Sequence, residues 1–210
     1  MKRTISALES FVIDYEVIFV DDGSTDQSLE RILYLQQQNN KIKILSLSKN
    51  FGHQAAYTAG LEYAKGEFVA MMDGDLQDPP ELLSEMYRMI NEEDFEIVSG
   101  KKVGRKGRKD RNLYAFLFHL FFRHIGEIEN MENSGNYSMM KREAVDALLL
   151  MKEKVRYLPG LRTFIGFRQG YVEFVREDRF KGKPKMNIRR LFVSLQMLFF
   201  PFQDFQYTFV

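Results

Sequence analysis

Two short stretches of the sequence place acidic residues where an apolar run ends. The first is VDDGSTD, residues 20–26, and the second is MMDGDLQDPP, residues 71–80. In the second stretch one residue separates Asp73 from Asp75, so both carboxylates can face a common cation. Oxygen ligands of this kind favour Mg²⁺ or Mn²⁺ over zinc. Such a cation offsets the charge of a diphosphate, so the spacing indicates a site for a phosphorylated ligand.

Strand and helix patterns alternate around these carboxylates. This alternation predicts an α/β fold with a mostly parallel central sheet flanked by helices, in which ligands bind beyond the carboxyl ends of the strands. Residues 67–73 are apolar on both faces, which predicts a central position in a parallel sheet. The strand patterns are at 15–20, 42–48, 67–73 and 95–100, and the helix patterns at 24–38, 52–66 and 78–90.

Two polar residues near predicted helix starts have structural explanations. Asp78, Pro79 and Glu81 have the spacing of an N-cap, a first-turn proline and a capping box. Asp78 is therefore predicted to begin a helix rather than to bind a ligand. His53 is expected to cap its helix or to pack near its start.

Two basic segments follow the fourth strand pattern. Residues 101–111 contain seven Lys or Arg residues, and a second basic segment spans residues 176–185 before an aromatic tail at 188–210. A charge run is usually a solvated surface, but two such runs together with a candidate metal motif favour an anionic substrate. The tail suits a membrane interface. Further patterns predict strands at 136–140 and 169–177 and helices at 142–151 and 158–167.

Composition excludes several classes of protein. The 210 residues are enough for one domain with a substantial core. The chain has no Cys and three His, which excludes disulfides and thiolate metal sites and disfavours a His-rich metal centre. A formal net charge of +1 provides no general attraction for nucleic acid. No apolar run reaches the length that spans a bilayer, and residues 1–15 lack the apolar segment of a signal peptide.

Three stretches together resemble the family 2 glycosyltransferases of the GT-A fold. They are VDDGSTD, SLSKNFGHQAAYTAGLEYAKGEFVAMMDGDLQDPPE and RFKGKPKM, and the resemblance runs from about Tyr15 to Asn187. The chain is similar in particular to the polyprenyl-phosphate branch, which includes dolichyl-phosphate mannose synthases and bacterial undecaprenyl-phosphate glucosyltransferases.

The resemblance implies an inverting transfer of a sugar from a nucleotide-diphosphate donor to a polyprenyl phosphate, in cell-envelope or surface glycan synthesis. A UDP-sugar is the favoured donor, GDP-mannose is the alternative, and Mg²⁺ or Mn²⁺ is the implied cofactor. The implied location is the cytoplasmic face of a membrane, peripheral for this chain and integral if transmembrane helices follow it. Whether the chain forms a homo-oligomer stays open.

The same resemblance assigns roles to residues of this sequence. The implied nucleotide and donor contacts are Asp21, Asp22, Ser24, Asp73 and Lys101. The implied metal and diphosphate ligands are Asp73, Asp75 and Gln77. The acceptor phosphate would be held by Arg176, Arg179 and Lys185. The implied catalytic set is Asp75, Asn136, Arg111 and Arg179.

The chain departs from the family pattern at two places. Family members begin with a strand and a Pro-x-Tyr/Phe-Asn-Glu loop that this sequence lacks, so residues 1–187 are expected to form an N-terminally incomplete catalytic domain, followed by an amphipathic juxtamembrane tail at 188–210. Bacterial relatives often read Gly-Asp-Phe-Arg where this chain has GNYS. Asn136 thus stands at the place of a carboxylate, and it can orient a phosphate but cannot remove a proton.

Other functions stay open at this point. A family 2 transferase that extends a polysaccharide would need a general base, which the GNYS stretch makes harder to supply. A truncated domain could bind a nucleotide or a membrane without turnover. A phosphoacceptor signalling domain needs neither the second basic segment nor the tail, and a sugar nucleotidyltransferase would usually have a Gly-rich loop after its first strand.

Overall fold

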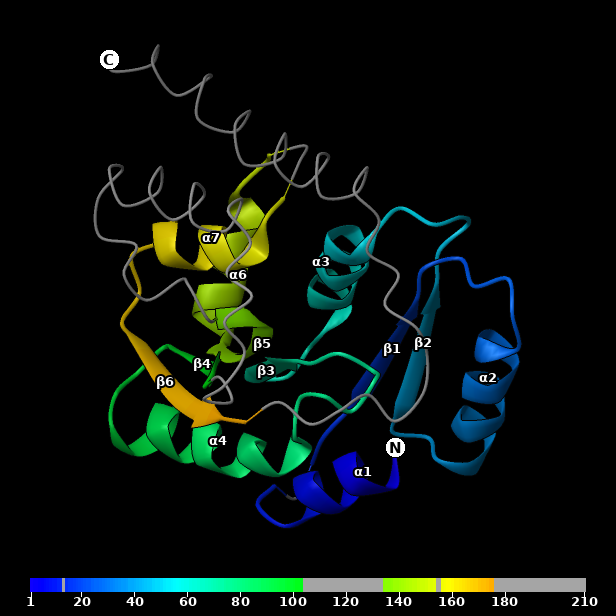
Figure 1. The fold of residues 1–210 in the computed structure, drawn as a ribbon, viewed down its shortest axis with the longest axis horizontal. Helices are drawn as coiled ribbons and strands as arrows, with labels where there is room; N and C mark the ends of the chain where they lie inside the picture. Colours follow the sequence, from blue (N-terminus) through cyan, green and yellow to red (C-terminus); the bar gives the residue numbers. More distant parts are fainter. Residues whose placement is uncertain (13, 104–133, 154–155, 176–210) are drawn as a thin grey trace, which may run out of the picture.

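A computed structural model describes residues 1–12, 14–103, 134–153 and 156–175. The predicted alternation of strands and helices is observed there (Figure 1). The strands are β1 (Val17–Asp21), β2 (Ile42–Ser46), β3 (Phe68–Met71), β4 (Ile97–Lys102), β5 (Ser134–Lys141) and β6 (Gln169–Phe174). The helices are α1 (Lys2–Glu9), α2 (Ser28–Gln38), α3 (His53–Tyr63), the 3₁₀ turn η1 (Pro80–Leu82), α4 (Leu83–Glu92), α6 (Arg142–Leu150) and α7 (Leu158–Phe164).

Several sequence predictions fall outside these residues. They are the roles of Arg111, Arg176, Arg179 and Lys185 and the tail at 188–210. No helix within the described ranges combines the length and the apolar character that crossing a bilayer requires.

The described strands form two separate sheets. β1 and β2 pair in parallel, and the second sheet has the order β3-β5-β4-β6. In the second sheet β4 and β6 are parallel, whereas β5 is antiparallel to both of its neighbours. The central, parallel position predicted for residues 67–73 was therefore wrong, because β3 pairs only with β5 among the described strands. The partner strand comes from a segment about 70 residues later in the sequence, which local apolar patterning cannot reveal.

Helix α3 joins the two sheets. A Cβ atom at Gly60 would lie 3.2 Å from Val20 of β1, while the next residue, Leu61, belongs to the core beside Val69 of β3. Just before both strands, the Glu16 side chain accepts a hydrogen bond of 2.7 Å from the backbone N–H of Lys65. β1 and β3 thus both pack against α3, but no ladder of hydrogen bonds joins them.

The apolar core lies on both faces of the four-stranded sheet. Figure 1 shows α4 on one side of this sheet and α6 and α7 on the other. The first cluster consists of Leu61, Val69, Met71, Ile97, Met140, Ala144, Val145, Leu148 and Leu158. The second consists of Leu83, Met86, Ile90, Val98, Tyr137, Met139, Val172 and Phe174. Alternating residues of β4 and β5 enter opposite clusters, as expected for a sheet covered on both faces.

The start of α4 differs from the prediction. Pro79 is the residue before η1, α4 begins only at Leu83, and neither start has a side-chain capping hydrogen bond. The buried carboxylate of Asp78 instead accepts a hydrogen bond of 3.2 Å from the backbone N–H of Asp73. Asp78 therefore shapes the loop that carries the acidic motif, and the predicted N-cap role was wrong.

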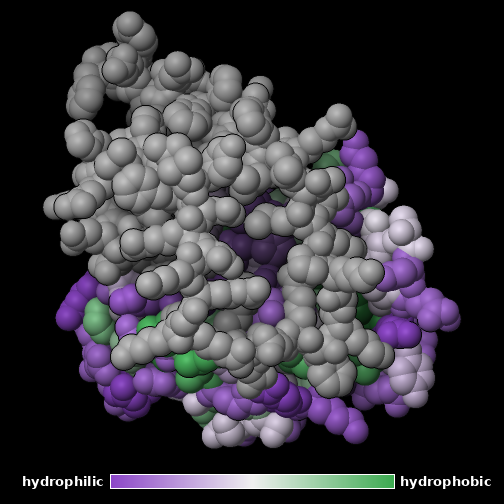
Figure 2. All heavy atoms as spheres, in the orientation of Figure 1, coloured by the Kyte–Doolittle hydropathy of each residue, from purple (hydrophilic) through white to green (hydrophobic). Residues whose placement is uncertain are grey.

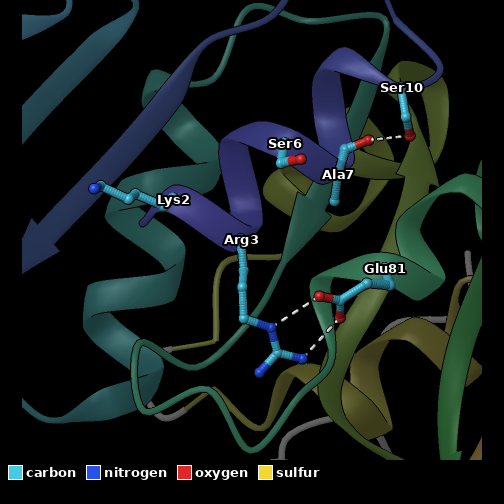
Figure 3. A pocket seen from close by; sticks show the side chains of 6 residues that line it. All are labelled: Lys2, Arg3, Ser6, Ala7, Ser10 and Glu81. Atoms are coloured by element: carbon cyan, nitrogen blue, oxygen red, sulfur yellow. Dashed lines mark hydrogen bonds and ion pairs between the residues drawn. The ribbon is translucent and has the colours of Figure 1, made fainter.

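Helix α1 is attached to the turn that follows this loop. Figure 3 shows Arg3 donating two hydrogen bonds to Glu81, of 2.8 and 3.0 Å. Both side chains are largely exposed, so the ion pair fixes a position more than it adds stability. The hollow beside this pair contains none of the predicted site residues and is lined by Lys2, Arg3, Ser6, Ala7, Ser10 and Glu81.

Candidate functional site

The carboxylates after β1 are engaged by nearby backbone groups. Asp21 is buried and accepts a hydrogen bond of 3.3 Å from the N–H of Ser24. Asp22 accepts hydrogen bonds of 2.7 Å from Phe51 and 2.9 Å from Gly52, both from backbone N–H groups. Asp22 therefore fastens the end of β1 to the residues that precede α3. Asp21 shapes the turn, and of the two carboxylates Asp22 is the less buried.

Gly23 lies in the same turn at a position that excludes a side chain. Its φ angle is +65°, in the left-handed region, and a Cβ atom there would lie 2.5 Å from the backbone carbon of Lys49. The loops after β1 and β2 thus touch through this glycine, which sets the shape of the predicted nucleotide side of the site.

Asp73 is the best-connected carboxylate after β3. Its Oδ1 atom accepts hydrogen bonds of 2.8 Å from the Tyr57 hydroxyl and 2.9 Å from Nε2 of His53. The His53 hydrogen bond, with smaller contributions from Tyr57 and the charge of Lys102, lowers the pKa of Asp73 to about 2. Burial and the adjacent Asp73 raise the pKa of Tyr57. Asp73 is therefore a carboxylate anion at neutral pH, with Tyr57 as a neutral donor.

The rest of the acidic motif forms a tight loop. The backbone N–H of Gln77 donates to Oδ1 of Asp75 at 3.1 Å, and Leu76 between them has a φ of 60°, which is rare for a residue with a side chain. No group of three or more His, Cys, Asp or Glu side chains within the described residues is arranged to hold a metal ion. Two carboxylates and an amide oxygen nevertheless fit Mg²⁺ or Mn²⁺, because such ions often take their other ligands from water and substrate phosphates.

Asn136 and His53 come together from distant elements. Asn136 of β5 lies with Nδ2 at 3.2 Å from Nδ1 of His53, and its Oδ1 accepts a hydrogen bond of 3.3 Å from Gln54. His53 packs at the start of its helix as expected, with its ring centroid 4.7 Å from that of Tyr57. Its ring also joins Asn136 to Asp73, which the sequence did not indicate. Sequence reasoning missed Gln54 altogether, although two polar residues opening a helix after NFG were a local signal.

Lys101 and Lys102 have different surroundings. The Lys101 ammonium lies 3.3 Å from Glu173 of β6. The Lys102 ammonium lies where a Cβ atom at Gly135 would be 3.1 Å away, and its charge helps to lower the pKa of Asp73. Lys102 is thus a second cation whose charge acts on the acidic motif, beside the predicted role of Lys101, which stays a prediction.

Arg162 of α7 is a buried cation that the sequence did not reveal. It donates to the backbone oxygens of Gly135 at 2.6 Å and Asn136 at 3.2 Å and to the hydroxyl of Ser138. Burial lowers its pKa to about 10, so the guanidinium stays charged at neutral pH. No carboxylate in the described part of the chain forms an ion pair with it, and its main partners are carbonyl dipoles of β5.

The N-terminal end of α3 is the meeting point of the site. Asp22 binds the residues before this helix, Asp73 binds its first turns, and Asn136 contacts its first residue. Figure 2 shows hydrophilic side chains in the middle of the face that it displays. The arrangement presents oxygen ligands and a nearby cation, Lys102, as a metal-bound diphosphate requires.

Comparison with known families identifies the chain. The family model described as glycosyl transferase family 2 matches residues 1–149. The chain belongs to glycosyl transferase family 2.

Relatives within this family agree with the branch indicated by the sequence. A protein named uncharacterized glycosyltransferase from Synechocystis is 38% identical over 192 residues, which are 90% of this chain and 59% of that protein. The prophage bactoprenol glucosyl transferase homolog of Escherichia coli is 30% identical and matches 88% of this chain and 60% of its own length. The chain thus spans about three fifths of each relative.

Solved structures share the fold. A mannosyltransferase from Pyrobaculum calidifontis, in complex with GDP-Man and Mn²⁺, has a TM-score of 0.59 at 18% identity and matches 94% of this chain and 57% of its own. The glucosyl-3-phosphoglycerate synthase of Mycobacterium tuberculosis, in complex with Mn²⁺ and UDP, has a TM-score of 0.56 at 18% identity, with 94% and 72% matched. The predicted GT-A fold is therefore confirmed.

Proposed function

We propose that this chain carries the donor site of an inverting glycosyltransferase that moves a sugar from a nucleotide-diphosphate donor to a polyprenyl phosphate. The observation that carries the proposal is the meeting of Asp22 and Asp73 at the start of α3, where the charge of Lys102 also acts on Asp73. The bactoprenol relative supports a lipid phosphate as acceptor. Solved neighbours that hold UDP or GDP-Man together with Mn²⁺ support a metal-dependent donor site, with UDP-sugar favoured over GDP-mannose.

The donor would lie across the two acidic loops. Asp73, Asp75 and the amide oxygen of Gln77 would hold Mg²⁺ or Mn²⁺, which when bound neutralises the charge of the diphosphate. The turn at residues 22–24 would contact the nucleotide. Lys102 would attract the diphosphate from the side of β4, in addition to the role predicted for Lys101.

The reaction needs little acid or base chemistry. An oxygen of the acceptor phosphate, already an anion at neutral pH, attacks the anomeric carbon, while the bond from that carbon to the diphosphate oxygen breaks and the electron pair leaves with the nucleoside diphosphate. Attack from the face opposite the leaving group inverts the configuration. The residues of this chain position the donor and stabilise the leaving charge. An amide at Asn136 is compatible with this chemistry and disfavours an acceptor hydroxyl, which would need a base.

We also retain the predicted organisation as a proposal. Residues 1–187 form the catalytic domain and residues 188–210 a juxtamembrane tail that places it on the cytoplasmic face of a membrane.

A thermal-shift titration with UDP, GDP and their sugars, each with and without Mn²⁺, tests the donor site. A ligand that binds only the folded state raises the melting temperature, so a metal-dependent rise with one nucleotide is expected. Asp75→Asn should abolish this rise. Asp146→Asn, an exposed carboxylate on α6, is the matched control that should preserve it. A rise that persists in Asp75→Asn would refute the metal role of the motif.

A further inference from the structure

The backbone N–H of Leu158 fixes the orientation of the Gln54 side chain. This N–H donates to Oε1 of Gln54 at 3.0 Å. A backbone N–H can only donate, so the oxygen of the amide must face α7 and the NH₂ group must face away from it. The orientation of the Gln54 amide is therefore set by a group that can only donate a hydrogen bond.

The orientation passes from Gln54 to Asn136 and then to His53. The NH₂ group of Gln54 points to Oδ1 of Asn136, so the NH₂ group of Asn136 points to Nδ1 of His53. An amide NH₂ group only donates, and therefore Nδ1 is an acceptor without a proton. The ring proton is then on Nε2, which faces Oδ1 of Asp73.

We propose that Gln54, Asn136 and His53 form a hydrogen-bond relay that fixes the neutral Nε2–H tautomer of His53 and orients the Asp73 carboxylate for the donor. The three are positioning residues, because they act on the donor through Asp73. The proposal rests on the proposed function only for what Asp73 binds.

The relay determines which carboxylate oxygen of Asp73 is left to bind a cation. The hydrogen bonds from His53 and Tyr57 both end on Oδ1, and within the described residues this leaves Oδ2 to face a cation. A metal-binding carboxylate held by a neighbouring imidazole is set in one rotamer, and such outer contacts strengthen metal binding. In this relay Asn136 helps to orient the Asp73 carboxylate and does not remove a proton.

Arg162 holds the strand that carries the central amide. Its guanidinium binds the backbone oxygens of both Gly135 and Asn136, so the position of Asn136 relative to α3 is fixed by α7. Leu158, which begins the relay, belongs to the same helix. One helix therefore sets both the start of the relay and its middle.

Reversing the Asn136 amide would place donors against donors and acceptors against acceptors. If the Asn136 amide were reversed, its NH₂ group would face the NH₂ group of Gln54, two donors in contact. Its oxygen would then require a proton on Nδ1 of a neutral His53, and the bare Nε2 would face the Asp73 carboxylate, two acceptors in contact. The backbone N–H of Leu158 thus selects one of two arrangements for all three side chains.

Nitrogen NMR of the His53 ring at pH 7.5 tests the proposal. His119 and His124, which lie outside the described residues, are replaced by Gln so that ¹⁵N-His labelling reports on His53 alone. The full chain without ligand is expected to show the Nε2–H tautomer. In Gln54→Glu the side chain can accept from Leu158 but cannot donate to Asn136, so a mixture of tautomers is expected. In Asn136→Asp an acceptor faces Nδ1, and the ring should carry a proton on Nδ1.

A second readout is the affinity for Mn²⁺ in the absence of nucleotide, measured from the paramagnetic broadening of the NMR signals. Gln54→Glu should weaken this affinity about tenfold, the lower end of what loss of an outer contact costs. The matched control is Gln37→Glu on the exposed surface of α2, which adds the same charge and should change neither readout. Melting temperatures of all variants check that they are folded.

Two results would overturn the relay. One is an Nδ1–H tautomer in the otherwise unchanged chain, and the other is a Gln54→Glu spectrum identical to that of Gln37→Glu. Failure of the proposed function looks different, because a chain that binds no nucleotide diphosphate can still show the fixed tautomer. A chain that transfers sugar with an averaged tautomer would keep the function and lose the relay.

Discussion

The two sheets of this protein end in the same kind of acidic loop but are packed differently. Among the described residues, the two-stranded sheet of β1 and β2 contributes one buried apolar side chain, Ile42. The other four strands contribute Val69, Met71, Ile97, Val98, Tyr137, Met139, Met140, Val172 and Phe174. The apolar residues of β1 are only half-buried, although their sequence is that of an interior strand.

The carboxylates reflect this difference. Asp22, on the two-stranded side, is held by backbone N–H groups of one loop. Asp73, on the four-stranded side, is held by the side chains of His53 and Tyr57 of α3, and His53 in turn contacts Asn136 of β5. The two similar motifs are thus held by different kinds of neighbours. We infer a firmly held diphosphate side and a more easily opened nucleotide side.

The largest expected contrast comes from the same Leu→Ala truncation made beside the four-stranded sheet and in the two-stranded sheet. Leu148→Ala removes a side chain fully buried against the four-stranded sheet and should lower the free energy of unfolding by about 2–5 kcal/mol. Leu45→Ala in β2 removes a half-buried side chain and should cost about half as much or less. Urea denaturation of both variants measures the difference. Equal losses would show that the two sheets are packed equally well.

A second contrast uses the glycines of the two acidic loops. Gly23→Ala forces a side chain into the left-handed region and against the backbone of Lys49, and should cost about 2 kcal/mol or more. Gly74→Ala meets no atom within 4 Å and should stay within about 0.5 kcal/mol of the unchanged chain. Thermal or urea unfolding distinguishes them. A comparable loss in Gly74→Ala would mean that the loop after β3 is as constrained as the loop after β1.

Acid should weaken the Asp73 side of the site. The pKa of Asp73 is about 2 in the folded chain, against an ordinary value of 3.8. The resulting stabilisation of about 2 kcal/mol is complete above about pH 5 and is lost as the pH falls toward 2. The stability advantage over Asp73→Asn should therefore shrink between pH 5 and pH 2. A constant difference over this range would contradict the proposed coupling of Asp73 to His53 and Tyr57.

Hydrogen exchange gives the smallest but most direct contrast. Backbone N–H groups in β1 and β2 should exchange roughly tenfold or more faster than those in β4 and β5, because half-buried strands open more easily. Mass spectrometry of deuterium uptake measures both sheets in one sample. If β1 proves as protected as β5, the separation of the two sheets has no consequence for stability.

Some tertiary features had no local signal. Asp78 matched the pattern of a helix cap but binds the N–H of Asp73, five residues earlier, since a buried carboxylate takes the donor that the folded loop presents. Arg162 occupies an ordinary helical position in the sequence. Its importance follows from the strand that happens to lie beside it.

The sequence by itself determined the alternation of strands and helices, the acidic ends of β1 and β3 and the family, because apolar periodicity, turn residues and motifs are properties of neighbouring residues. Only the tertiary structure decided that β3 pairs with β5 and that the charge of Lys102 acts on Asp73. It also decided that Leu158 binds Gln54, that Gln54 and His53 contact Asn136, and that His53 contacts Asp73. These relations join segments up to about 100 residues apart. They depend on packing and on hydrogen-bond partners that no local pattern encodes.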